Sequence, residues 1–373
     1  MSTQNKPLDP KHIDAAEQIR DSKVSQLNRI PTAAQWSHLW KKPQFQASSV
    51  DHAGPQHFRN WHPRPEHLTP WAILRWVFAR KNSTWHAEPT PLATPALDLH
   101  ALHQPDSEHL QVSLLGHACV LIQLHGYHFI TDPVWADYVS HQQGMGPKRA
   151  RPMAIALDQL PKIDAVLLSH NHYDHMDIAT LNWLHARFQM PILTGLGNAQ
   201  YLPPDMQVIE LDWWQNYFFN DDIELVYTPA QHGSGRGVRD QNKALWGGFS
   251  VLSDTAHCYF AGDTAYAEHF RWIAERLGPP DIACLPIGAY EPRRLMQYLH
   301  MNPEDAWQAH QDLQAQHSIA IHHGMFQLTD ESQWEPWQRL LDLQRQNPDI
   351  SPFHCGSEGL MIRLKLKPEQ SEI

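Results

Sequence analysis

The sequence has few cysteines and no long hydrophobic run. Its four cysteines, Cys119, Cys258, Cys284 and Cys355, lie far apart and form no CxxC pair. This spacing excludes a zinc-finger pattern and a dense disulfide framework, so we expect a reducing compartment, the cytoplasm. No stretch of about 18 apolar residues occurs, which excludes a conventional transmembrane helix. The polar N-terminus lacks the apolar region of a secretory signal.

Positive charge is also scarce. The formal net charge of −11 argues against broad binding to a phosphate backbone, so we expect no nucleic-acid partner. With 42% hydrophobic and 18% charged residues, the composition is that of a folded globular protein. Histidine is abundant instead, at 27 residues, which raises the expectation of metal chemistry.

The first part of the chain differs from the rest. Residues 1–105 are rich in Pro, His, Gln and Trp and show little strand alternation. They predict an N-terminal extension that packs on or caps a catalytic domain over residues 106–373. Within the extension, the segment from Pro70 to Lys81 predicts a helix with one apolar face. Two interpretations of this helix stay open: it touches lipid at a membrane interface, or it packs on the catalytic domain.

From Leu110 onward, short apolar runs and helical periodicity take over. Strands are expected over residues 111–115, 119–124, 128–131, 165–169, 223–227, 248–252, 258–260, 282–285 and 319–321. Helices are expected after a capping Asp177 and over residues 266–277, 303–315 and 332–345. Strands that cluster first and then alternate with helices predict an α/β (α+β) fold in which two sheets lie between helix layers.

The central motif is SHNHYDH over residues 169–175. In an extended stretch, the side chains of His170, His172 and Asp174 point the same way. His175 follows where the chain turns toward the next helix. Imidazole nitrogen and carboxylate oxygen are ligands that zinc accepts, so the motif predicts a metal site.

Other ligand-type residues recur at the ends of later strands. His232 follows a strand and Pro229, Asp263 ends a strand in FAGDT, and His322 ends a strand in AIHHG. Polar ligands at strand ends in four separate segments are what a site at a sheet edge requires.

These motifs resemble a known family. The order HxHxDH, His, GDT and a late His is similar to the metallo-β-lactamase superfamily, which implies a four-layered αββα sandwich. Four longer segments resemble the N-acylphosphatidylethanolamine-hydrolysing phospholipase D family in its bacterial branch: GPKR (146–149), IDAVLLSHNHYDH (163–175), ELDWW (210–214) and PIGAYEPR (286–293). The similarity runs from Phe58 to Phe326, with FRNW (58–61) and LRW (74–76) as weaker matches upstream.

The resemblance implies a site with two metal ions. One ion is expected on His170, His172 and His232, the other on Asp174, His175 and His322, with Asp263 bridging both. Two Zn²⁺ are expected, and iron and manganese stay open. The expected nucleophile is a hydroxide held between the ions. Asp263, Asp174 and His300 are the residues expected to act in catalysis.

Further residues are expected around the ligands. His117 and Asp132 end early strands and could support the ligating histidines; for Asp132, a turn-forming role before Pro133 stays equally open. His300 is expected either to contact a substrate phosphate or to lie in a surface loop.

The loop after His232 departs from the animal enzymes. It reads GSGR, so their acyl-chain preference does not carry over. Arg236 in this loop and the later Lys243 either attract an anionic substrate or are solvated.

The implied function is hydrolysis of N-acylphosphatidylethanolamine to an N-acylethanolamine and phosphatidic acid. Two alternatives stay open: a lactonase or other phosphate-ester hydrolase of the same superfamily, and a catalytically idle, metal-bound lipid-binding protein. The expected partners are a phospholipid or other phosphodiester substrate, the surface of the inner membrane through peripheral contact, and a second copy in a homodimer.

Overall fold

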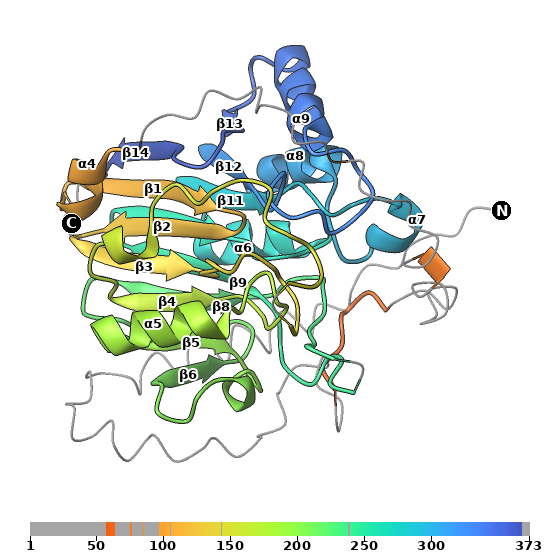
Figure 1. Cartoon of the computed structure of the whole chain (residues 1–373). Helices are drawn as coiled ribbons and strands as arrows, with labels where there is room; N and C mark the ends of the chain where they lie inside the picture. Colours follow the sequence, from red (N-terminus) through yellow and green to blue (C-terminus); the bar gives the residue numbers. More distant parts are fainter. Residues whose placement is uncertain are drawn as a thin grey trace, which may run out of the picture. The chain divides into compact units, whose positions relative to one another are not determined.

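Two mixed β-sheets, each of seven strands, form the framework of the described residues (Figure 1). The computed structural model describes residues 57–63, 75, 76, 85, 97–104, 106–142, 144–237 and 239–367. These belong to one unit, Ser48–Ile373, and a second unit, Met1–Ala47, lies outside the described residues. The helix expected from Pro70 to Lys81 lies mostly outside them too, although Arg75 and Trp76 are helical. The boundary at residue 105 stays a prediction.

The first sheet has the strand order β14-β1-β2-β3-β4-β5-β6. Its strands are β1 (His109–Gly116), β2 (Cys119–Leu124), β3 (Tyr127–Thr131), β4 (Ala165–Leu168), β5 (Ile192–Gly195), β6 (Val208–Leu211) and β14 (Met361–Lys365). The strands from β14 to β3 pair antiparallel, and those from β3 to β6 pair parallel.

The second sheet has the order β13-β12-β11-β10-β9-β8-β7. Its strands are β7 (Asn216–Phe218), β8 (Glu224–Thr228), β9 (Gly248–Ser253), β10 (Ala256–Phe260), β11 (Ile282–Pro286), β12 (His317–Ile321) and β13 (Phe353–His354). The strands β8, β10, β11 and β12 run in the same direction, so their carboxyl ends meet at one edge.

Alternation along the strands divides the core into three apolar layers. In β4, Ala165 and Leu167 face the layer between the sheets, whereas Val166 and Leu168 face the outer side of the first sheet. The second sheet repeats this alternation in β10 to β12. Because successive strand residues point to opposite faces, an all-apolar strand buries both faces.

Helices cover the two outer faces (Figure 1). The helix α5 (Ile178–Phe188) packs on the first sheet through Leu181 and Leu184, and Asp177 caps it by accepting a hydrogen bond from Ala179 N. The helices α6 (His269–Leu277), α8 (Pro303–Asp312) and α9 (Glu335–Gln346) pack on the second sheet. Two shorter helices are α4 (Leu99–His103) and α7 (Arg293–Met296).

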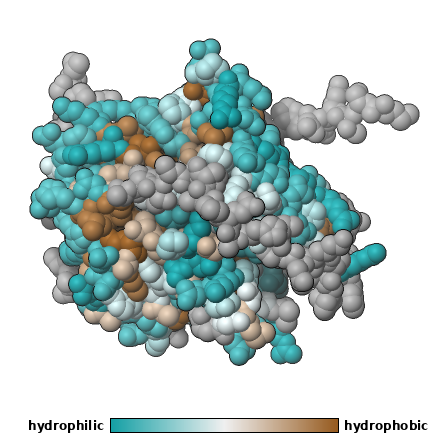
Figure 2. All heavy atoms as spheres, turned by 45° about the horizontal axis from the view of Figure 1, so that its top comes forward, coloured by the Kyte–Doolittle hydropathy of each residue, from teal (hydrophilic) through white to brown (hydrophobic). Residues whose placement is uncertain are grey.

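The order helix, sheet, sheet, helix confirms the expected αββα sandwich. All nine expected strands are present, and β5, β6, β7, β13 and β14 are additional. No helix among the described residues has the length and hydrophobicity needed to span a bilayer. Figure 2 shows a largely hydrophilic face on which hydrophobic side chains gather in patches.

Candidate metal centre

The candidate ligands come from both sheets and meet at one edge. The segment His170–His175 connects β4 to α5, so it starts in the first sheet. His232, Asp263 and His322 follow β8, β10 and β12, which are strands of the second sheet. The parallel direction of these three strands places their carboxyl ends, and therefore these side chains, side by side.

Three histidines form the first group. His170 Nε2 lies 2.7 Å from His172 Nδ1, and His232 Nε2 lies 3.3 Å from the same His172 atom. One ring nitrogen from each residue lies within 4.8 Å of the others, a spacing at which they could hold one metal ion.

The second group contains a carboxylate and three histidines: His117, Asp174, His175 and His322. Asp174 Oδ2 lies 3.1 Å from His117 Nε2, 3.4 Å from His175 Nε2 and 3.3 Å from His322 Nε2. His322, rather than the neighbouring His323, faces this group. His117 lies among the candidate ligands, which is closer than the supporting position expected from the sequence.

Asp263 lies between the two groups. Its Oδ2 atom is 3.6 Å from His232 Nε2 in the first group, and 3.2 Å and 3.1 Å from the Nε2 atoms of His175 and His322 in the second. A carboxylate that reaches both groups is the residue type that can bridge two cations.

Burial and neighbouring charge set the protonation of these residues. Burial lowers the pKa of His170 and His232 well below the usual value, so both rings are neutral and offer a lone pair. Burial also lowers the pKa of His175, but Asp263, Asp174 and Asp132 together raise it well above the usual value. Burial raises the pKa of Asp263, yet His175 and His322 hold it well below its usual value. The Asp263 carboxylate is therefore ionised and available as a ligand.

An unpaired polar atom shows that these residues fit a metal. Asp263 Oδ1 is buried and makes no hydrogen bond. Leaving a buried polar atom unpaired costs about 1–3 kcal/mol, and more for a charged one. A cation among the Nε2 atoms and carboxylate oxygens would remove this cost, which supports metal binding.

Comparison with known proteins agrees with this geometry. A family model described as the β-lactamase superfamily domain matches residues 127–323. The N-acyl-phosphatidylethanolamine-hydrolyzing phospholipase D 1 of Caenorhabditis elegans is 35% identical over 309 residues, which are 79% of this chain and 87% of that protein. The chain belongs to the metallo-β-lactamase superfamily. It is a metal-dependent hydrolase that resembles the N-acylphosphatidylethanolamine-hydrolysing members.

Two further relatives extend the comparison. The mitochondrial N-acyl-phosphatidylethanolamine-hydrolyzing phospholipase D of Saccharomyces cerevisiae is 33% identical over 234 residues, which are 61% of this chain and 50% of that protein. The solved structure of Igni18, a metallo hydrolase from Ignicoccus hospitalis, has a TM-score of 0.52 at 20% identity and covers 69% of this chain and 100% of that chain. At this identity the likeness of Igni18 shows the fold alone.

Asp132 holds the candidate ligand His175 in place. Its Oδ2 atom accepts hydrogen bonds from His175 Nδ1 at 2.6 Å and from Ser169 Oγ at 2.5 Å, and its Oδ1 accepts one from Ser169 N at 2.7 Å. Because a carboxylate only accepts, His175 carries its proton on Nδ1 and presents Nε2 to the centre. Asp132 therefore does more than form a turn before Pro133.

Three residues of the site have left-handed backbone. His117, Asp132 and His322 have φ values of 52°, 33° and 58°. Residues other than glycine rarely adopt these values, and such strain gathers at functional sites. The sequence carries no signal for this conformation.

The remaining expected residues are now placed. His300 Nδ1 lies 3.8 Å from Asp263 Oδ2 with its side chain 13% exposed, so His300 is part of the cluster rather than of a surface loop. Arg236 Nη1 donates to Asn171 O and Met176 O at 3.0 Å and 2.9 Å, and its guanidinium lies 4.0 Å from the Tyr173 ring centroid. Arg236 thus stabilises the loop between β4 and α5, which carries the motif at 169–175 and is called the motif loop below. Lys243 is exposed.

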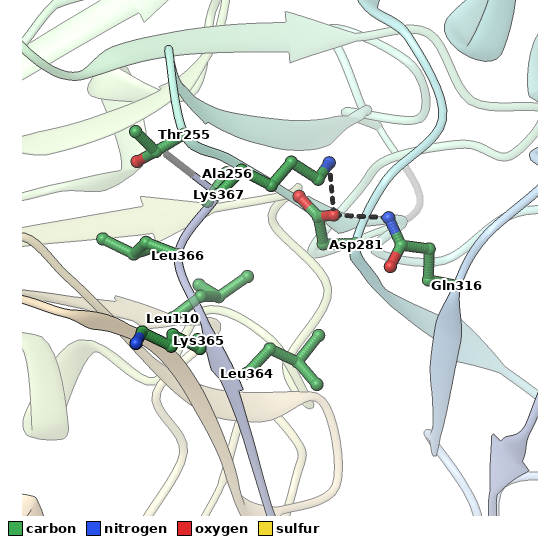
Figure 3. Close-up of a pocket in the computed structure, with 9 residues that line it drawn as sticks. All are labelled: Leu110, Thr255, Ala256, Asp281, Gln316, Leu364, Lys365, Leu366 and Lys367. Atoms are coloured by element: carbon green, nitrogen blue, oxygen red, sulfur yellow. Dashed lines mark hydrogen bonds and ion pairs between the residues drawn. The ribbon is translucent and has the colours of Figure 1, made fainter. Parts of the chain in front are cut away.

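One pocket lies away from this chemistry. Its volume is about 180 Å³, and its lining includes Asp281 and Gln316, which precede β11 and β12 (Figure 3). It therefore opens at the amino ends of the strands whose carboxyl ends carry the candidate metal centre. Figure 3 shows Asp281 paired with Lys367 Nζ at 2.6 Å and Gln316 Nε2 at 2.7 Å, so its carboxylate is already neutralised.

A second pocket adjoins the candidate ligands. It has a volume of about 200 Å³ and is lined by Phe58, Arg59, Asn60, Pro63, Gln231, His232, Asn242, Tyr298 and Leu299. These residues combine a cation with apolar and aromatic side chains. The weak FRNW match at residues 58–61 therefore lies beside His232.

Proposed function

We propose that the chain is a phosphodiesterase that hydrolyses N-acylphosphatidylethanolamine to an N-acylethanolamine and phosphatidic acid. It would use two zinc ions, one on His170, His172 and His232 and one on Asp174, His175 and His322, with Asp263 between them. The observation that carries this proposal is the position of Asp263 Oδ2, within 3.6 Å of a ring nitrogen from each histidine group.

The centre would supply the nucleophile and the charge stabilisation. Two cations held by these residues would lower the pKa of a bound water molecule to near neutrality and would polarise a phosphoryl oxygen. No side chain needs to attack the phosphorus.

Hydrogen bonds orient the candidate histidine ligands, and His300 lies beside them as a neutral ring. His232 Nδ1 donates to Leu299 O at 2.8 Å, and His175 Nδ1 donates to Asp132, so each ring turns Nε2 inward. Burial lowers the pKa of His300 to about 4, so its ring is neutral near pH 7. Its Nδ1 atom is buried without a hydrogen-bond partner. We propose that this nitrogen contacts the substrate phosphate.

Apolar groups beside the centre support a lipid substrate. Val134, Val139, Met325 and Phe326 form one small cluster, and the Phe326 ring packs edge-on against His117 with centroids 5.1 Å apart. Leu295 and Met296 form another with Trp76 and Tyr298, close to His300 in the chain. Tyr298 also lines the pocket of about 200 Å³ beside His232, together with Phe58 and Leu299, and an apolar lining of this kind suits an acyl chain better than a small polar ester.

The test is a direct assay of the purified protein. The metal is removed, zinc is restored, and N-acylphosphatidylethanolamine in mixed micelles is supplied in water enriched in ¹⁸O. We expect the label in phosphatidic acid, because water attacks phosphorus and the N-acylethanolamine leaves with its own oxygen. His172→Ala should abolish this activity, and His141→Ala, at an exposed histidine, should leave it unchanged.

Other results would redirect the proposal. Hydrolysis of lactones or phosphomonoesters without release of N-acylethanolamine would contradict the lipid substrate. Zinc binding without turnover of any of these substrates would favour the idle lipid-binding protein. Location in the cytoplasm, peripheral contact with the inner membrane and a homodimer remain predictions.

A further inference from the structure

The segment 57–63 is bound to the chain around His232, although it lies outside the matched domain at 127–323. Phe58 is buried in the layer between the sheets, and its N donates to Asn242 O at 2.8 Å. The Trp61 ring packs edge-on against Trp213 with centroids 5.2 Å apart. Gln231 Nε2 donates to His62 O at 2.8 Å. These contacts fix the segment on both sides of residue 60.

Asn60 pairs with both backbone polar groups of His232. Its Nδ2 donates to His232 O at 2.7 Å, and its Oδ1 accepts from His232 N at 3.1 Å. Trp246 Nε1 also donates to Asn60 Oδ1, at 3.2 Å. The same indole N–H also donates to Ala230 O at 2.9 Å, so it is shared between two acceptors. Because it only donates, it favours the orientation in which Asn60 Oδ1, and not Nδ2, faces the His232 N–H.

Two sets of bonds then determine where His232 Nε2 points. Asn60 fixes the peptide planes on both sides of the residue, and Leu299 O accepts from Nδ1 and so fixes the ring and its tautomer. His232 is itself 2% exposed, so it has little room to find another rotamer. A small rotation of its backbone would move Nε2 away from His172 and Asp263.

We infer that Asn60 is a positioning residue for the metal centre, which makes the segment 57–63 part of that centre. The inference rests on the proposed role of His232 as a ligand, but not on the substrate. Only a carboxamide of this length offers one donor and one acceptor here. An aspartate would place a carboxylate oxygen against the His232 carbonyl oxygen, and glutamine is one methylene too long.

The experiment measures metal affinity rather than activity. Metal-free Asn60→Asp and Asn60→Ala proteins, checked for folding by circular dichroism, are titrated with Zn²⁺ against a competing chelator. We expect one of two binding events to weaken by about tenfold to hundredfold, the usual effect of removing a partner of a ligating histidine. In the cobalt-substituted protein, the visible absorption of the same site should shift. Asn60→Ala, which adds no repulsion, should show the smaller loss.

The matched control is Asn198→Asp. Asn198 is fully buried, and its Nδ2 donates to Gly195 O and Leu245 O at 3.0 Å and 2.9 Å. This variant should lower the unfolding temperature and leave both zinc affinities unchanged. Wild-type zinc affinity and cobalt absorption in either Asn60 variant, or equal losses in the Asn60 and Asn198 variants, would overturn the inference. Because no lipid is used, this result is independent of the proposed substrate.

Discussion

Replacing Asp132 by asparagine should weaken metal binding without changing the shape of the site. Asp132 accepts three hydrogen bonds, one from His175 Nδ1 and two from Ser169. An asparagine keeps one acceptor oxygen and turns the other position into a donor. If that donor faces His175, the imidazole must move its proton to Nε2 and can no longer bind a metal there. If it faces the Ser169 N–H, two donors oppose each other in a buried site.

The size of the effect follows from the bond that is lost. A hydrogen bond to a charged group contributes about 1.5–3 kcal/mol. Since about 1.4 kcal/mol corresponds to a factor of ten, the zinc dissociation constant should rise by roughly tenfold to hundredfold. The assay is competition titration of the metal-free variant, with unfolding by urea measured in parallel.

The control for this variant is Asp281→Asn at the opposite edge of the sheets. Asp281 is 5% exposed and accepts from His257 N at 2.9 Å and Gln316 Nε2 at 2.7 Å. This variant should lose stability with unchanged zinc affinity. An Asp132→Asn protein that binds two zinc ions as tightly as the wild type would refute the orienting role of Asp132.

Two more predictions concern protons and backbone. Burial lowers the pKa of His322, but Asp263 and Asp174 raise it to about 9 in the metal-free protein. Its contribution to metal-free stability is therefore complete below about pH 6.5 and is lost as pH rises through about 9. Zinc affinity should rise over the same pH range, because the ring must lose a proton before it binds the ion. Calorimetry at pH 7 in two buffers measures this proton release. A zinc affinity that does not change with pH would contradict the prediction. At Gly262, φ is 61° and an added Cβ would lie 2.7 Å from Ser169 Cβ. Gly262→Ala should therefore lower the free energy of unfolding in urea by about 1–3 kcal/mol, and an unchanged value would contradict the close approach.

Local patterns were sufficient to predict the framework and the candidate ligands. Short apolar runs identified β1 to β4, and the motif at 169–175 gathers four candidate ligands after one strand. The expected extended segment is wrong beyond His172, because the chain turns there: His175 N and Met176 N both donate to His172 O, at 3.1 Å and 2.8 Å. The strands β5 and β6 were not predicted, because β5 has only two large apolar residues, Ile192 and Leu193, and β6 is only partly buried. The strand β14 forms the edge of the first sheet beside β1, although the two strands are far apart in the sequence. Local sequence patterns do not show such a pairing.

Long-range contacts explain what the sequence did not reveal at the site. Asn60 and His232 are 172 positions apart, and nothing in FRNW indicates that its asparagine would pair with that peptide. His117 lies with the candidate ligands because the turn between β1 and β2 adopts a left-handed φ, which composition does not encode. Arg236 was expected either to attract anions or to be solvated, and instead it binds two carbonyl oxygens of the motif loop.

The origin of the candidate ligands in both sheets has a consequence for the lifetime of the protein. An ion held by His170 and His172 from the first sheet and by His232 from the second would link the two sheets of the sandwich. An ion that binds only the folded chain shifts the unfolding equilibrium by mass action. Metal scarcity would thus remove the catalyst and at the same time expose the chain to proteolysis, so the cellular amount of this hydrolase should follow the supply of its ion.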